Sequence, residues 1–132
     1  MKQQEFTNYI IQELIKSFPQ FEGHLTTKPG DIIDIDFKSN NENLTLWVTT
    51  QDKEITIGFT GYTECDWHTH MSLFGANTPH EELFAAIELI DNILRDKQPI
   101  IFSNIKGYFL TDNIDINVVS NEAIQILKWS DL

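Results

Sequence analysis

Residues 65–70 hold the densest group of side chains in this chain that could carry chemistry. In an extended strand alternate residues point to the same side, so Asp66, His68 and His70 are expected to share one face. A His-x-His pair on a strand can bind zinc, with Asp66 or His80 as a third ligand and water in an open position. The alternative is that these polar side chains form the solvent face of a strand whose other face packs into the core.

The cysteine content argues against that metal site. Structural zinc sites usually combine cysteines in pairs, and Cys65 is the single cysteine of the chain. Cys65 is also a poor candidate for a nucleophile beside a histidine, because the acidic residues around it disfavour the reactive thiolate. We therefore expect no bound metal and no cofactor, and a buried position for Cys65 as a small apolar side chain.

Recognisable catalytic motifs are absent from the rest of the sequence. It contains no glycine-rich phosphate loop, no Gly-x-Ser-x-Gly motif and no His-Glu-x-x-His motif, and Arg95 is its one arginine. The carboxylate pair Asp34 and Asp36 could exchange protons with a substrate, but paired acids on the outer face of a strand are usually solvated surface. The sequence thus favours a binding protein over an enzyme.

The charge of the chain indicates the kind of partner. It carries 20 Asp and Glu residues against 9 Lys and Arg residues, a formal net charge of -11, spread along its whole length. Such a field repels nucleic acid and anionic lipid and attracts basic surfaces, so we expect a basic protein partner and neither nucleic acid nor membrane. The candidate contact residues are Asp34, Asp36, Glu64, Asp66, His68 and His70.

Two segments have the periodicity of amphipathic helices. Residues 4–18 place apolar side chains on one stripe, and Pro19 ends that segment. The motif Thr78-Pro79-His80-Glu81 has the elements of a capping box, and an apolar face follows over residues 83–94. The sequence therefore predicts one helix near the N-terminus and a second in the middle of the chain.

Other segments alternate apolar and polar residues with the period of half-buried strands. Short polar connections join the first three, so neighbouring strands are expected to pair antiparallel as a meander. The last segment fits a helix or a strand, and we interpret it as a strand because no long helical period is present. The expected strands cover residues 33–37, 44–48, 55–59, 64–71, 100–102, 107–110, 114–118 and 124–129.

These elements predict an α+β fold, with a mostly antiparallel sheet and one or two helices packed on one face. The length of 132 residues and the lack of a linker predict a single domain over residues 1–132. The single cysteine suits a reducing compartment, and the N-terminal segment is unlike a signal peptide. No apolar run reaches the length needed to span a bilayer, so we expect a cytoplasmic protein.

Several short runs also carry a resemblance to a known group. They are Ile55-Thr56-Ile57-Gly58-Phe59, Asp66-Trp67-His68-Thr69-His70, Ile90-Asp91-Asn92-Ile93-Leu94, Ile100-Ile101-Phe102 and Ile126-Leu127-Lys128-Trp129-Ser130. Residues 55–130 thereby resemble small bacterial proteins akin to the immunity proteins of polymorphic and contact-dependent toxin systems. The resemblance implies a cytoplasmic protein that neutralises a toxin domain, often a basic nuclease, through an acidic surface. It transfers no functional residues, because immunity proteins use diverse surfaces.

Three hypotheses follow from the sequence. The first, which we favour, is an immunity-type inhibitor that covers a basic toxin domain. The second is a small metal-dependent hydrolase built on His68, His70 and His80. The third is a regulatory or assembly domain whose acidic face binds another basic partner.

Overall fold

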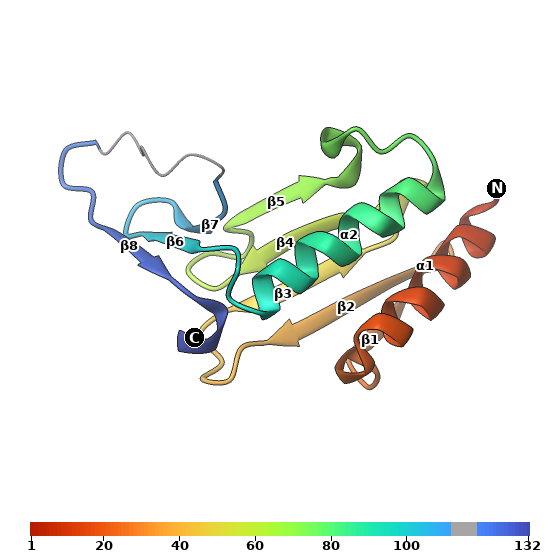
Figure 1. Ribbon diagram of the computed structural model, residues 1–132, viewed down its shortest axis with the longest axis horizontal. Coiled ribbons are helices and arrows are strands. Elements are labelled where there is room, and N and C mark those ends of the chain that lie inside the picture. Colours follow the sequence, from red (N-terminus) through yellow and green to blue (C-terminus); the bar gives the residue numbers. More distant parts are fainter. Residues whose placement is uncertain (112–118) are drawn as a thin grey trace.

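The computed structural model describes residues 1–111 and 119–132, and the expected strand at 114–118 lies outside these residues. The described residues form an α+β fold of helices and antiparallel sheets, as the sequence predicts (Figure 1). Helices α1 and α2 cover one face of the larger sheet, and the smaller sheet lies at its side (Figure 1). No helix in the described part of the chain is long and apolar enough to cross a membrane.

The larger sheet is a five-stranded meander in which strand order follows chain order. Every neighbouring pair is antiparallel, and for β2, β3 and β4 the short polar connections predicted this. The first strand was not predicted, because all of its residues are exposed and show no apolar alternation. The strands are β1 (Leu25–Lys28), β2 (Ile32–Lys38), β3 (Thr45–Thr49), β4 (Thr56–Thr60) and β5 (Trp67–His70).

Both predicted helices are present. Helix α1 (Gln3–Ser17) stops just before Pro19, which starts a short 3-10 turn. Helix α2 (Pro79–Leu94) begins where the capping motif predicted, and the Glu81 backbone N–H donates to the Thr78 hydroxyl oxygen at 3.1 Å. These local signals fix where each helix starts or stops, and burial of one face holds it against the sheet.

The core lies between the helices and the larger sheet. Alternate residues of β2, β3 and β4 point into it, and the apolar stripes of both helices cover them. The buried apolar side chains of these elements include Phe6, Ile10, Leu14, Ile35, Leu46, Val48, Ile57, Phe59, Leu83, Ala86, Ile90 and Ile93. Because this layer takes most of the apolar residues of these strands, the opposite face of the sheet is mainly polar, with Trp47 as an aromatic exception.

The smaller sheet has the order β7-β6-β8. Its strands are β6 (Ile100–Ser103), β7 (Gly107–Phe109) and β8 (Ile124–Leu127). The ambiguous segment near the C-terminus is thus a strand, as predicted, and the chain then enters a short 3-10 turn that begins at Trp129. Burial of Trp129 explains that change of direction, since its ring stacks on Phe37 of the larger sheet with the ring centroids 6.2 Å apart.

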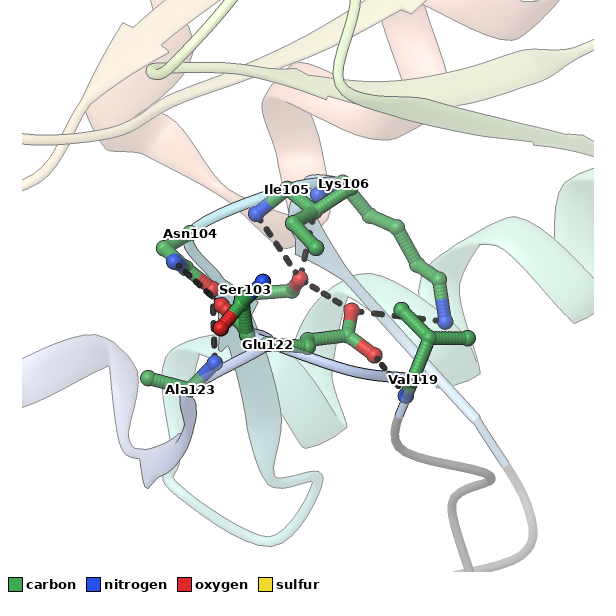
Figure 2. A network of polar contacts seen from close by, with 8 residues as sticks. Ser103, Asn104, Ile105, Lys106, Val119, Glu122 and Ala123 are labelled. Atoms are coloured by element: carbon green, nitrogen blue, oxygen red, sulfur yellow. Dashed lines mark hydrogen bonds and ion pairs between the residues drawn. The ribbon is translucent and has the colours of Figure 1, made fainter.

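A buried carboxylate organises the turns of the smaller sheet (Figure 2). Glu122 accepts a hydrogen bond from the Ser103 hydroxyl and another from the Val119 N–H at 3.1 Å, and Lys106 Nζ lies 3.5 Å away. Ser103 Oγ in turn accepts the N–H groups of Ile105 and Lys106 at 3.1 and 3.0 Å. The Ser103 hydrogen bond, followed by that from Val119, lowers the pKa of Glu122. This network joins the β6–β7 turn to the residues that lead into β8.

One glycine of the larger sheet is required by close packing. Trp47 lies across Gly58 of β4, and a Cβ at position 58 would lie 2.6 Å from the Trp67 carbonyl oxygen of β5 as well as inside the Trp47 ring. We expect Gly58→Ala to lower the free energy of unfolding by about 1–3 kcal/mol, because the backbone of the next strand would have to move to remove the clash. Urea unfolding measures the loss, and an unchanged midpoint would contradict this packing.

Candidate functional site

The face of the larger sheet opposite the helices, here called the open face, gathers several of the predicted site residues. The strand register places Asp36, Trp47, Gly58 and His68 in one row across β2 to β5. A parallel row holds Asp34, Thr49, Thr56 and His70. The structure therefore brings Asp34, Asp36, His68 and His70 onto one surface, although they come from two distant parts of the sequence.

The first row centres on His68 and Trp47, whose ring centroids lie 6.3 Å apart. The His68 and His70 rings meet edge to face at 5.3 Å. Cys65 Sγ lies 3.8 Å from His68 Nδ1 and is exposed, so the expectation of a buried Cys65 is wrong. The reason is that Cys65 lies in the loop before β5, outside the regular strand that would have turned its side chain into the core.

The second row is occupied by internal contacts. His70 Nδ1 lies 2.9 Å from both the Glu54 carboxylate and the Thr56 hydroxyl. Asp34 is half-buried and forms an ion pair with Lys28, whose pKa the Asp34 hydrogen bond and charge raise. Asp34 Oδ1 is buried without a hydrogen bond in the described part of the protein. Asp34 and His70 are therefore tied to neighbours in their own sheet.

Asp36 differs from Asp34 in being exposed, with no ion pair to another described residue. An exposed carboxylate beside Trp47 and His68 is free to meet a partner, whereas breaking the Asp34–Lys28 pair would leave a half-buried charge uncompensated. Within the open face, Asp36 is consequently the acid best placed for an external contact.

Asp66 does not join the histidines, and the expectation that it shares their face is wrong. Strand β5 starts one residue later, and the Asp66 carboxylate turns back to accept the N–H groups of Tyr62 at 2.9 Å, Thr63 at 2.6 Å and Tyr108 at 2.9 Å. A side chain at Gly107 would collide with it. Burial raises the pKa of Asp66, but the hydrogen bonds from Tyr108, Tyr62 and Thr63 outweigh it, so the pKa lies below its usual value.

The remaining predicted residues are also apart from the open face. Glu64 is exposed in the loop before β5, and its carbonyl accepts the Thr60 hydroxyl at 3.0 Å. His80 lies in the first turn of α2, on the covered side of the sheet, with Nδ1 3.2 Å from the Tyr9 hydroxyl. The sheet thus separates His80 from His68 and His70. Among the described residues, no group of three His, Cys, Asp or Glu is placed to hold a metal ion.

A hollow of about 810 Å³ lies between α2 and β5, and we call it the groove. Phe74 and Phe84 flank it and are 55% and 68% exposed, unusually open for such large apolar side chains. Glu81 and Glu88 line the same hollow, and no lysine or arginine is among the described residues around it. Its described lining is Trp67, Thr69, Phe74, Gly75, Ala76, His80, Glu81, Phe84, Ala85, Glu88, Leu89, Asn92, Gln98, Leu110 and Thr111.

The groove was not predicted from the sequence. One signal was available: Phe84 falls outside the apolar stripe of α2, and it is exposed, as are Leu73 and Phe74 before that helix. That signal marks apolar residues outside the core, but only the tertiary packing of α2 beside β5 brings Phe74 and Phe84 to one hollow.

Comparisons with known proteins add no relative. No family model, curated protein or solved structure matches this chain. The resemblance to immunity proteins therefore stays a prediction, and the functional argument depends on the surfaces described above.

Proposed function

We propose that this chain is a binding protein, not an enzyme, and that it captures a basic protein partner in the groove between α2 and β5. A toxin domain that is neutralised by being covered is the partner class that we favour. The observation that carries this proposal is the described lining of the groove, which combines exposed aromatic rings with the acids Glu81 and Glu88 and includes no Lys or Arg.

The combination suits a protein better than other ligands. Exposed aromatic and aliphatic side chains beside the groove supply the apolar contact area that the centre of a protein interface needs. The acids around them favour Lys or Arg side chains on the partner and repel phosphates, so nucleic acid and anionic membrane are unsuitable. The net charge of -11 extends this preference to long range, because it attracts basic molecules before contact.

The open face is the second candidate contact surface. Asp36, Trp47 and His68 lie there in one cross-strand row and offer an exposed acid next to a half-buried aromatic ring. We favour the groove because Lys28 of β1 and Lys38 of β2 lie on the same face of the sheet as Asp34 and Asp36 and offset their charge. For the location, we propose the cytoplasm, where the free and exposed Cys65 would stay reduced.

The partner protein tests the proposal directly. A basic protein encoded by a gene next to this one would be the candidate partner, and surface plasmon resonance would measure its association with this chain. The association rate is expected to fall about tenfold or more between low and high salt, because screening removes the long-range attraction. Glu88→Lys should weaken binding about tenfold, since it places a positive charge against a basic partner.

Two matched variants separate the surfaces. Glu22→Lys makes the same charge change on an exposed residue outside both surfaces and should leave the dissociation constant within about twofold. Asp36→Lys makes a charge reversal on the open face. If Asp36→Lys weakens binding while Glu88→Lys does not, the partner contacts the open face. An association rate that does not change between low and high salt would contradict the electrostatic argument.

A further inference from the structure

We infer that the partner inserts an extended, basic segment that pairs with the outer edge of β5, where no other described strand is hydrogen-bonded, and lays its side chains into the groove. This inference rests on the proposed function and specifies how the groove is used. It draws on the geometry of the β5 edge, on the side chains beside it and on the charge of the groove.

Strand β5 is an edge strand of the larger sheet, hydrogen-bonded to β4 alone among the described strands. The Met71 N–H donates to the Ile55 carbonyl at 3.1 Å, so Thr69, two residues earlier, faces β4 in the same way. The backbone N–H and C=O groups of His68 and His70 consequently point to the opposite side. They present two donors and two acceptors at the spacing that an added strand requires.

Two of the usual protections against strand pairing are absent from β5. Natural edge strands carry lysine, proline or a bulge that discourages a further strand. The opposite edge of the sheet, β1, follows this rule with Lys28, which is exposed. Strand β5 reads Trp-His-Thr-His, with neither Lys nor Pro. An edge strand that has neither residue and lies next to a groove suits strand addition.

The groove lies on the side of β5 to which Trp67 and Thr69 point. Every second side chain of an added strand would point to the same side, because side chains alternate along a strand. Those side chains would meet the apolar surface of Phe74, Phe84 and Leu89. Apolar residues at alternate positions of the segment are therefore expected.

The charge of the site selects basic residues for the rest of the segment. Glu81 and Glu88 stand on the groove side, and Glu54 stands beside His70 on the other. With carboxylates on both sides of the edge, a segment that alternates Lys or Arg with apolar residues has complementary charge on either face. An acidic segment would meet repulsion in both directions.

A synthetic peptide pair tests strand addition. One heptapeptide alternates Lys and Val, and the control is the same sequence with every backbone nitrogen methylated, which keeps the charge and the side chains but removes the backbone donors. We expect the Lys-Val peptide to bind at least about tenfold more tightly and to slow amide hydrogen exchange at His68 and His70. Phe84→Ala should weaken this binding and, being an exposed position, leave the fold unchanged.

The outcomes separate this inference from the proposed function. Equal binding of both peptides, or no binding of either, overturns strand addition. Binding of the full partner protein without protection of the His68 and His70 amides also overturns it, while leaving the proposed function in place. Loss of all binding to the basic partner protein would instead remove the proposed function itself.

Discussion

Truncating Ile57 or Ile90 to alanine is expected to lower the free energy of unfolding by about 2–5 kcal/mol, a large share of the stability of a small domain. Both side chains are 0% exposed, Ile57 in the middle of β4 and Ile90 on the covered face of α2. Removing either leaves a cavity in a close-packed core, so transfer energy and packing are lost together. Urea denaturation and thermal melting measure the effect.

Ile126 provides the matched control. It lies in β8 and is 61% exposed, so Ile126→Ala removes the same atoms with little loss of burial. We expect a change within about 0.5 kcal/mol. Thermal midpoints of Ile57→Ala and Ile90→Ala that match the parent would mean that the assigned strand and helix faces are wrong.

Replacing Asp66 by alanine is expected to cost roughly 3 kcal/mol, because three backbone N–H groups lose a charged acceptor at once. The lost hydrogen bonds should destabilise two parts of the structure. The loop before β5 would lose the acceptor for Tyr62 and Thr63, and β7 would lose the Tyr108 contact that ties it to the larger sheet. Amide hydrogen exchange at these residues should accelerate.

The same carboxylate predicts a pH dependence. Since hydrogen bonds hold the pKa of Asp66 below its usual value, Asp66 binds fewer protons in the folded state than in the unfolded state at acidic pH. Its contribution to stability is complete above the unfolded pKa of about 3.9 and is lost as the pH falls through the lower folded pKa. Asp66→Asn should therefore flatten the acid limb of the stability curve.

Asp36→Asn is the control for that measurement, because Asp36 is exposed and has no comparable set of backbone donors. Its acid limb should follow the parent. If Asp66→Asn and the parent lose stability in parallel on acidification, the carboxylate does not stabilise this junction between the sheets.

Local sequence signals account for most of the fold. Three patterns each predict the secondary structure of their own segment. They are the four-residue apolar period of α1, the capping motif of α2 and the alternation in β2 to β4. Strand β1 carries no such signal, because all of its residues are exposed and it is a strand only through pairing with β2. Its prediction would need the position of β2 beside it, and the apolar pattern of the sequence carries no information about that pairing.

The candidate site was partly predictable for the same reason. Alternation within β2 and β5 predicted that Asp34 joins Asp36 and that His68 joins His70. Their meeting on one open face required the register of four strands. The role of Asp66 was missed because a strand that starts one residue later turns its side chain toward a loop and β7. The groove needed the position of α2 beside β5.

The meander order of the larger sheet also has a kinetic consequence. Each strand from β2 to β5 pairs with the strand that directly precedes it in the chain, so every hydrogen-bonded ladder of this sheet closes through a short connection. Helix α1, by contrast, precedes all five strands in the sequence and packs against strands that come later in the chain. Hairpins can therefore form early and in succession, whereas the docking of α1 brings together distant parts of the chain and belongs to the slower steps of folding.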